Sequence, residues 1–379
     1  MPVVPLPSKG LVAGEPARRE WPTMDLEEPD VVVVGLGPAG ARAAAAAAAA
    51  GLDVLAIDRR RRPGVPVQCA EFVPMMIARE VEGVGATTTQ LIRRMLTVVD
   101  HGKPEETPNC PGRIIDRVRF DSMLVQEAAR AGAVCRFGTT LRRVTSDATL
   151  IMSDGSACRP RLVIGADGPR SRVGAAIGAV NRDVVETRQV TVSLTRPHDA
   201  TDIFLHADYR GGYGWLFPKG SFANVGVGVS LEERQHLKQL LAALLSKLAL
   251  TGRVGTHASA LTGGAIAVGG RLCAVGRIAK MPALLSGDAA GLTHPVTGAG
   301  IAAAVQSGTL AGRAAVEWFG GRHSALDAYE QELGDVFDVA LARARRRRHE
   351  TLTCYRTGTR PDAHALRVGW ISSPRYWAT

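Results

Sequence analysis

The stretch Val31-Val32-Val33-Val34-Gly35-Leu36-Gly37-Pro38-Ala39-Gly40 decides how this chain begins to fold. Four consecutive valines predict a buried strand, because β-branched side chains favour strands and an unbroken apolar run is typical of a strand covered on both faces. The glycines predict a tight turn, and the alanine run at residues 43–50 predicts a helix that lies close to the sheet. A second apolar run ends at Asp58, so residues 30–59 are predicted to form a β-α-β unit.

The spacing of the glycines indicates a dinucleotide-binding turn. Gly35 permits the turn, Gly37 lets a pyrophosphate approach the backbone, and Gly40 allows helix and strand to pack closely. The start of the helix directs unpaired N–H groups and the positive end of its dipole at phosphate. Asp58 follows Gly40 by 18 residues, where a carboxylate can accept hydrogen bonds from a ribose diol. The predicted contacts from this unit are Gly35, Gly37, Pro38, Ala39, Gly40, Asp58 and Arg59.

Size, charge and cysteine content narrow the class of protein. With 379 residues and 46% hydrophobic content, the chain can form two closely packed domains or one elaborated α/β unit. Its formal charge of +10 would favour anionic partners, although a solvated basic surface explains the charge as well. We expect no nucleic-acid partner and at most peripheral membrane contact. The six cysteines form no CxxC pair, which argues against a metal site or a disulfide scaffold and favours a cytoplasmic location.

Further motifs follow in an order that resembles a known family. They are Val67-Gln68-Cys69-Ala70-Glu71, the segment 117–121, Gly165-Ala166-Asp167-Gly168, the segment 213–220, Gly263-Gly264-Ala265-Ile266 and the segment 287–300. Over residues 30–329 the chain resembles flavoproteins of the geranylgeranyl reductase family, within the wider glutathione-reductase-type FAD fold shared with aromatic hydroxylases. The resemblance implies an α/β fold in which a Rossmann-type, GR2-like FAD-binding domain is interleaved with an antiparallel-sheet substrate domain.

The resemblance also implies which residues contact FAD. The carboxylate of Asp288 would bind flavin hydroxyls, and the helix that begins at Gly300 would direct N–H groups at the isoalloxazine ring and stabilise the anionic reduced flavin. In these reductases the loop that holds Cys69 sits close to the flavin, so we predict a catalytic role for this thiol; a small packing residue is the alternative. The further predicted FAD contacts are Cys69, Ala70, Arg117, Leu141, Asp167, Gly287, Asp288, Pro295, Gly298, Gly300 and Ile301.

Alternating aromatic residues predict the wall of a substrate site. Tyr213, Trp215 and Phe217 alternate along a predicted strand and therefore project to one face. Beside a flavin they would line a site for an extended apolar or a planar substrate, with Tyr213 and Trp215 as further catalytic candidates; plain core packing is the alternative. Lys219 ends the strand and is a candidate for binding an anionic headgroup, a nicotinamide phosphate or only solvent.

The changing patterns predict how the chain is divided. A helix is expected around residues 88–95, helices at 231–250, 301–319 and 325–349, and an antiparallel sheet from strands near 189–194, 202–206 and 224–229. The basic run at 343–348 is predicted to be a solvated face, or else a contact for a membrane surface or an acidic partner. The predicted divisions are a disordered tail 1–28, an FAD-binding domain 29–75, 112–180 and 265–350, a substrate or cap domain 76–111 and 181–264, and a C-terminal extension 351–379.

The leading functional hypothesis is an FAD-dependent oxidoreductase that reduces C=C bonds of a prenyl or other apolar substrate with a hydride from flavin. No second glycine fingerprint is present, so the reducing equivalents are expected from transiently bound NAD(P)H or from a ferredoxin-like or quinol donor.

The main alternative is an FAD-dependent monooxygenase that hydroxylates an aromatic ring through a C4a-hydroperoxyflavin. Its substrate would be a small molecule or a Trp or Tyr side chain of a peptide or protein during cofactor maturation, admitted by a C-terminus short enough to leave the cleft open. A non-enzymatic FAD-containing assembly partner is a third hypothesis.

Overall fold

Strand β1 (Val31–Val34) lies at the centre of a six-stranded sheet in the computed structural model, which describes residues 26–259 and 261–378. Residues 1–25 of the predicted tail 1–28 lie outside the described residues. Glu27, near the end of the predicted tail, forms an isolated β-bridge with Cys158. The sheet is parallel except for its edge strand β19. Its strands run in the order β19 (Val275–Ile278), β20 (Met281–Leu285), β12 (Leu162–Gly165), β1, β2 (Val54–Asp58) and β8 (Val134–Phe137).

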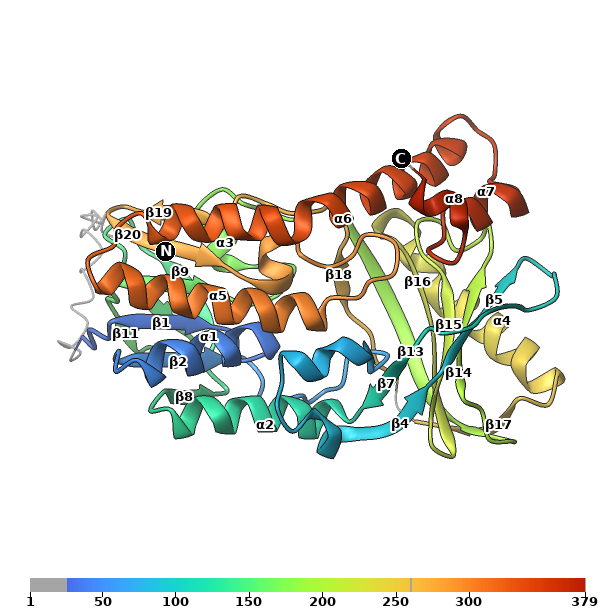
Figure 1. Cartoon of the computed structure of the whole chain (residues 1–379), viewed down its shortest axis with the longest axis horizontal. Helices are drawn as coiled ribbons and strands as arrows, with labels where there is room; N and C mark the ends of the chain where they lie inside the picture. The colour runs from blue at the N-terminus through green and yellow to red at the C-terminus, as the bar shows by residue number, and fades with distance from the viewer. Residues whose placement is uncertain (1–25, 260, 379) are drawn as a thin grey trace, which may run out of the picture.

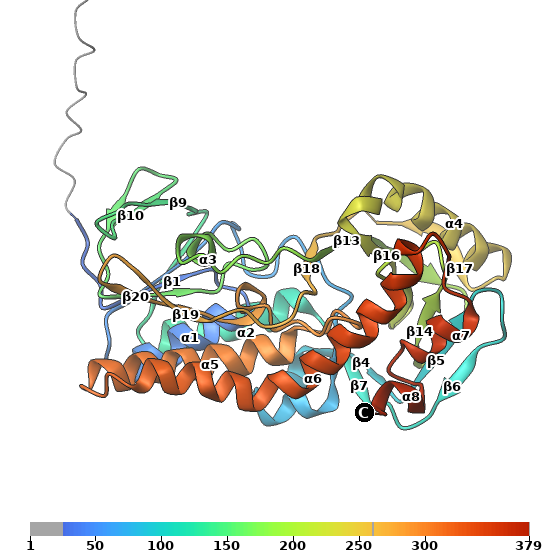
Figure 2. The same ribbon diagram turned by 90° about the horizontal axis from the view of Figure 1, so that it is seen from above.

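Helices cover one face of this sheet, as Figures 1 and 2 show. They are α1 (Pro38–Ala49), α2 (Arg117–Arg130) and α5 (Ile301–Phe319). The opposite face carries the short helix α3 (Arg172–Ala176) and a small sheet of β9 (Leu141–Val144), β10 (Leu150–Met152) and β11 (Ala157–Cys158). The valines of β1 are at most 4% exposed, as expected for a strand covered on both faces.

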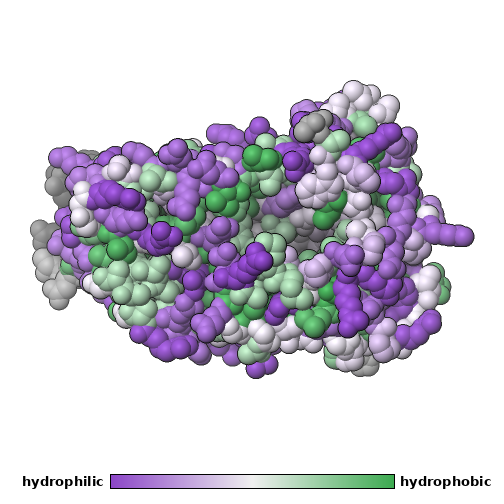
Figure 3. All heavy atoms as spheres, viewed as in Figure 1, coloured by the Kyte–Doolittle hydropathy of each residue, from purple (hydrophilic) through white to green (hydrophobic). Residues whose placement is uncertain are grey.

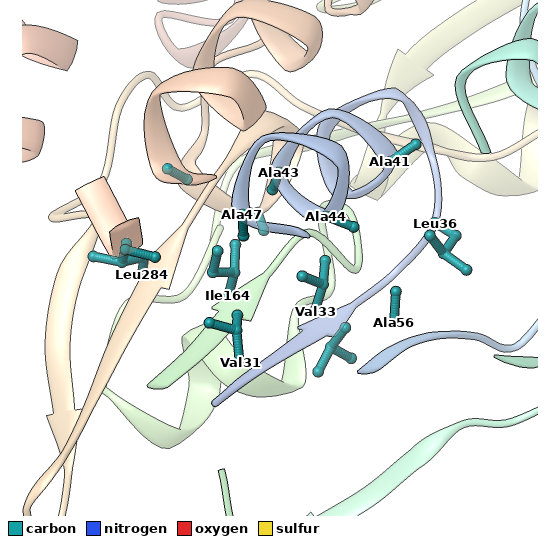
Figure 4. Close-up of a cluster of buried hydrophobic side chains, with 14 of the residues drawn as sticks. Val31, Val33, Leu36, Ala41, Ala43, Ala44, Ala47, Ala56, Ile164 and Leu284 are labelled. Carbon is teal, nitrogen blue, oxygen red and sulfur yellow. The ribbon is translucent and has the colours of Figure 1, made fainter. Parts of the chain in front are cut away.

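Small residues allow α1 to approach both the sheet and α5. Ala43, Ala44 and Ala47 pack beside Val31 and the neighbouring strands (Figure 4). On the α5 side, a Cβ added at Gly308 would lie 2.1 Å from the backbone oxygen of Ala39, so the two helix backbones touch at this point. The alanine run therefore serves close packing on two sides.

The second large element is an eight-stranded sheet at the other end of the molecule (Figure 1). Helix α4 (Leu237–Leu250), which follows the 3-10 helix η3 (Leu231–His236), covers one face with buried leucines. All strand pairs are antiparallel except β5 with β14. The order is β17 (Val254–Ala258), β13 (Val184–Leu194), β16 (Phe222–Ser230), β15 (Gly214–Lys219), β14 (Ala200–Leu205), β5 (Arg94–Val99) and β6 (Glu105–Thr107), with β18 (Ala265–Ala267) also paired to β13.

The helix predicted around residues 88–95 was wrong. That segment forms β4 (Thr88–Ile92) and the start of β5, after the 3-10 helices η1 (Met75–Arg79) and η2 (Val84–Thr87). Strand β4 joins β7 (Gly112–Ile115) and β3 (Phe72–Pro74) in a three-stranded sheet, and β5 pairs with β14 more than 100 residues later in the chain. These distant partners outweigh the weak local helical pattern.

The C-terminal helices connect the two ends of the molecule. Helix α6 (Ala325–Arg356) runs from the six-stranded sheet to the eight-stranded one, and α7 (Ala363–Val368) and α8 (Pro374–Trp377) pack beside it (Figure 1). No helix in the part of the chain that the structure describes has the length and apolar character needed to cross a bilayer. The parallel sheet with helices and the interleaved, mainly antiparallel sheet confirm the predicted α/β fold class.

Candidate functional site

The glycine turn contains one glycine that the protein itself does not require. A Cβ added at Gly35, which has φ 99°, would lie 2.3 Å from the oxygen of Ala166, and one at Gly40 would lie 1.7 Å from the oxygen of Gly35. A Cβ at Gly37, the N-cap of α1, would meet no atom within 4 Å. Open space before a helix N-terminus fits a pyrophosphate that approaches the backbone, so this turn fits the predicted dinucleotide.

Asp58 fixes this turn from the neighbouring strand. Its Oδ2 accepts the N–H of Leu36 at 2.8 Å, and its Oδ1 accepts the N–H of Arg60 at 2.7 Å. Each carboxylate oxygen retains a second lone pair, which is available to a ribose hydroxyl. The ribose contact itself stays a prediction, as do those of the half-buried Pro38, the buried Ala39 and the exposed Arg59.

Two of the predicted FAD contacts have clear structural partners. Leu141 is 1% exposed and packs in the core beneath the small sheet. Asp167 accepts the hydroxyl of Ser171 at 2.5 Å and the N–H of Arg172 at 2.7 Å, which anchors the start of α3. Burial raises the pKa of Asp167. These contacts explain both residues without a cofactor, and their predicted roles toward FAD stay untested.

The loop between β20 and α5 brings the Asp288 carboxylate to the start of α5. Gly287 and Gly298 adopt left-handed φ values of 59° and 69°, which favour glycine. Oδ1 of Asp288 accepts the hydroxyl of Thr293 at 2.7 Å, and a Cβ added at Gly300 would lie 2.9 Å from the same oxygen. The carboxylate and the helix N-terminus therefore adjoin, with the buried Pro295 and the half-buried Ile301 on the same segment.

Arg117, the first residue of α2, connects the Asp288 loop to Cys69. Its Nε and Nη2 each donate to the buried carboxylate of Asp121 at 3.0 Å. Burial disfavours the charged guanidinium, but the charges of Asp121 and Cys69 outweigh burial and raise the pKa of Arg117. Burial also raises the pKa of Asp288, opposed by the Thr293 hydroxyl and by the charge of Arg117. Cys69, Arg117 and Asp288 therefore interact within one site.

The loop that carries Cys69 is held by side chains of the eight-stranded sheet. Gln189 on β13 donates from Nε2 to the oxygen of Cys69 at 2.8 Å, and Asn224 on β16 donates from Nδ2 to the oxygen of Ala70 at 3.3 Å. The Cys69 thiol accepts the N–H of Glu71 at 3.2 Å. The thiol is thus fixed at the junction of the two large sheets.

Glu71 is the centre of this junction, and sequence reasoning assigned it no role. It is 2% exposed, with a left-handed φ of 69° that is uncommon for a residue with a side chain. Its carboxylate accepts Lys219 Nζ at 2.7 and 2.9 Å, Asn224 Nδ2 at 2.9 Å and the N–H of Arg117 at 3.1 Å. Lys219 is therefore engaged by Glu71, and its predicted contact with an anionic headgroup or a nicotinamide phosphate stays a prediction.

The aromatic residues project to one face of β15, as the alternation predicts. Trp215 and Phe217 are each 7% exposed and pack with Tyr213 on the face opposite α4. The hydroxyl of Tyr213 donates to the oxygen of Thr297 at 2.5 Å, in the loop before α5. Burial and the nearby Cys69 raise the pKa of Tyr213. Figure 3 shows a hollow on this side of the molecule, between its two ends.

The C-terminal helices cover this aromatic face, which differs from the expected open cleft. Trp370 is 3% exposed, and its ring lies edge-on to that of Tyr213 with centroids 4.9 Å apart. Tyr376 is 1% exposed and makes a hydrogen bond of 3.1 Å with Nε2 of His294. Nδ1 of His294 accepts the N–H of Thr297 at 3.2 Å, and burial lowers the pKa of His294 to about 4. No local pattern distinguished Trp370, Tyr376 or His294.

Arginines of the predicted basic run hold the C-terminal segment in place. Arg347 donates to the backbone oxygens of Arg375 at 2.6 Å and Ala378 at 2.7 Å, at the end of α8. Arg343 lies over the ring of Trp377, and Arg348 is buried and donates to the oxygen of Gly211. These three arginines contact their own chain, so the run is only in part the solvated face that was predicted.

Unpaired polar atoms near Cys69 indicate that a further group completes the site. Among the described residues, Gln189 Oε1 and Trp215 Nε1 are buried without a hydrogen-bond partner. Such orphaned atoms cost free energy unless a ligand or water satisfies them. The edge of a flavin carries acceptors and donors that suit them, so the residues present fit FAD. Within residues 26–259 and 261–378, no group of three or more His, Cys, Asp or Glu residues could hold a metal ion.

Comparisons with known proteins agree with this geometry. The FAD binding domain family matches residues 28–344. Digeranylgeranylglycerophospholipid reductase 1 of Methanopyrus kandleri is 35% identical over 345 residues, which cover 82% of this chain and 88% of that protein. The solved structure of a geranylgeranyl bacteriochlorophyll reductase-like protein from Thermoplasma acidophilum superposes with a TM-score of 0.78 at 26% identity and covers 90% of each chain.

A likeness at the level of the fold extends further. PqsL of Pseudomonas aeruginosa, described as a probable FAD-dependent monooxygenase, superposes with a TM-score of 0.69 at 18% identity over 90% of this chain and 99% of its own. The two reductase matches have higher identity, and the family match confirms FAD as the cofactor. The chain belongs to the geranylgeranyl reductase family of FAD-dependent oxidoreductases.

Proposed function

We propose that this enzyme reduces C=C bonds in the prenyl chains of a lipid. The observation that carries the proposal is the 35% identity, over most of both chains, to a digeranylgeranylglycerophospholipid reductase. The site supports it, because aromatic and apolar side chains of β15 and of the C-terminal helices pack together beside the loop that carries Cys69. Bound FAD supplies the hydride chemistry, and the protein supplies orientation, exclusion of water and a proton.

The aromatic wall suits an extended apolar chain. Trp215, Phe217 and Trp370 are almost fully buried, so their neighbours hold the rings in place and keep water from this face. Double bonds held against fixed rings are restricted in position, which favours reaction at one face of the bond. We therefore assign Trp215 and Phe217 to positioning of the substrate.

Among the predicted catalytic residues, Cys69 is the best proton donor. The proton of Tyr213 is engaged with the oxygen of Thr297, and burial raises the pKa of this hydroxyl, so it releases its proton less readily. The indole N–H of Trp215 is not an acid at neutral pH. The Cys69 thiol lies within interaction distance of the Arg117 guanidinium, so it is held in the site.

The electron donor is proposed to be transiently bound NAD(P)H or a ferredoxin-like protein. The single glycine turn belongs to the FAD domain, so a nicotinamide cofactor would have to bind elsewhere and leave after the transfer. The six cysteines are free, which supports work in a reducing compartment such as the cytoplasm.

The test is anaerobic turnover of the FAD-loaded enzyme. Dithionite-reduced enzyme is incubated with a geranylgeranylated glycerophospholipid, and the lipid mass is followed. We expect the mass to rise in steps of two hydrogens. An unchanged lipid mass, with oxygen incorporated into an aromatic substrate when air and NADPH are supplied, would contradict the proposal.

The role of Cys69 is tested with a matched cysteine variant. Cys69→Ala should retain FAD and lower the turnover rate by about 100-fold, the scale of lost general acid catalysis. Cys354→Ala removes a half-buried cysteine from α6 and should leave the rate unchanged. Equal rates for the two variants would show that the thiol only fills space.

A further inference from the structure

A basic pocket opens next to the loop that carries Cys69. Its volume is about 590 Å³, within the range of ligand-binding clefts. In Figure 2 the elements that line it lie between α3 and α4, where β13 and β18 run. Its polar walls include Gln68, Arg170, Arg188, Arg234, Gly263 and Gly264.

Three arginines reach this pocket from separate segments of the chain. Arg170 precedes α3, Arg188 is on β13 and Arg234 is on η3. Arg170 forms an ion pair with Glu186, which also lines the pocket. The guanidinium groups of Arg188 and Arg234 have no hydrogen-bond or ion-pair partner among the residues that the structure describes. The pocket therefore has two uncompensated positive charges.

Hydrogen bonds connect the lining of this pocket to the loop that carries Cys69. Gln68 Nε2 donates to the oxygen of Gly263 at 2.6 Å, and the hydroxyl of Thr187 donates to the oxygen of Gly264 at 2.8 Å. Gln68 directly precedes Cys69, and Ile266 contacts the turn at Gly298 in the loop between β20 and α5. A group bound in the pocket would therefore lie beside Gln68, the residue directly before Cys69.

We propose that Arg188 and Arg234 bind a phosphate group of a ligand whose reactive end enters the flavin site. Guanidinium groups pair with phosphate through two parallel hydrogen bonds, and two of them neutralise its charge. Two ligands of the proposed reaction carry such a group: the glycerophosphate head of the lipid and the phosphates of a nicotinamide donor. The inference rests on the proposed function for its choice of ligands, but phosphate binding can be measured without turnover.

The first experiment measures binding of inorganic pyrophosphate to the FAD-loaded enzyme by calorimetry. The double variant Arg188→Gln/Arg234→Gln should raise the dissociation constant at least tenfold. The control Arg130→Gln/Arg313→Gln removes the same charge from exposed positions on α2 and α5, which lie on the other face of the six-stranded sheet. This control should change the dissociation constant for pyrophosphate by less than a factor of two. Equal constants for the two double variants would overturn the inference, whatever the enzyme reduces.

The second experiment identifies the source of the phosphate. The wild type and the variant Arg188→Gln/Arg234→Gln are compared in two assays. With dithionite as reductant, the KM of each protein is measured for a prenylated glycerophospholipid and for a phosphate-free prenyl alcohol. With NADPH as reductant, the dependence of anaerobic flavin reduction on NADPH concentration is measured for each protein. A higher KM for the phospholipid alone assigns the pocket to the lipid head, and weaker NADPH dependence alone assigns it to the donor. If neither changes, the inference fails, while reduction of the prenyl alcohol still tests the proposed function separately.

Discussion

At the α1–α5 contact two helices touch through glycine and alanine backbone, whereas at the Cys69 loop the two large sheets are joined by buried polar side chains. The first contact is set by volume, since Gly308 leaves no space for a methyl group against Ala39. The second is set by charge, since Glu71 meets Lys219, 148 residues later in the chain. The FAD-binding end should therefore be sensitive to size, and the junction to the loss of a hydrogen-bonding partner.

The largest effect is expected from a methyl group at the helix contact. Gly308→Ala places its Cβ 2.1 Å from a backbone oxygen, which cannot move without shifting α1 and the glycine turn. We expect a loss of about 3 kcal/mol or more in the free energy of unfolding, as for severe overpacking. Urea unfolding of the FAD-free protein measures this loss.

Gly37→Ala is the matched control, because the added methyl group meets no protein atom within 4 Å. We expect it to leave the FAD-free protein as stable as the wild type and to weaken FAD binding about tenfold, since the pyrophosphate would meet the new methyl group. Equal destabilisation by both substitutions would show that size is not what distinguishes the two glycines.

The first region could be predicted from sequence because its signals are local. The four valines, the glycine spacing and the end of β2 at Asp58 lie within 30 residues, and helix α5 begins and ends at the predicted residues 301 and 319. The glycines at 308 and 312 on α5 contributed nothing to the prediction, because their partner α1 is more than 250 residues away. A close approach of two helices has no signature within either helix alone.

The second region could be predicted only in part. The prediction that Trp215 and Phe217 project to one face of β15 is confirmed, because alternation along a strand is a local pattern. The partner of Lys219 and the strands at 88–99 were missed, because each depends on contacts far along the chain. The basic run was misjudged in part for the same reason: nothing in its sequence shows that Arg347 meets the end of the chain.

A smaller loss is expected at the junction. Glu71→Gln keeps the shape of the side chain but removes the charge that Lys219 faces and turns one acceptor into a donor. We expect a loss of about 2 kcal/mol, typical of a buried group left without its charged partner. Lys219→Met should cost a similar amount, and the double variant less than the sum, because the two side chains form one interaction.

Glu127→Gln provides the comparison for the junction. Glu127 pairs with Arg42 on the helical face at 2.5 Å, but its side chain is 45% exposed. Exposed pairs contribute little, so the loss should stay below about 1 kcal/mol. Additive losses for Glu71→Gln and Lys219→Met, or an equal loss for Glu127→Gln, would remove the distinction between the junction and an ordinary surface pair.

At neutral pH the smallest effect is expected from the protonation of His294, where the C-terminal helices meet the loop between β20 and α5, because this effect appears only as the pH falls. Because Nδ1 accepts the N–H of Thr297, the proton of the neutral ring lies on Nε2 and is donated to the oxygen of Tyr376. The pKa of His294 is about 4 in the folded protein, below its ordinary value of 6.5. As the pH falls from 6.5 to 4, the unfolded chain binds a proton that the folded chain does not, so stability decreases across this window.

The contribution of His294 is obtained from the free energy of unfolding in urea, measured at several pH values between 7 and 4. The variant His294→Gln shows the pH dependence that all other groups cause, and the difference from the wild type is the contribution of His294. His294→Gln should have a shallower profile than the wild type, by about 3 kcal/mol across the window. Tyr376→Phe removes only the hydroxyl that accepts from Nε2, so its profile should be lower than that of the wild type and parallel to it. Parallel profiles for the wild type and His294→Gln would mean that the folded and unfolded chains take up the His294 proton over the same pH range. Burial would then not keep the ring neutral, and the polar contact between α8 and the loop between β20 and α5 would persist with a charged His294.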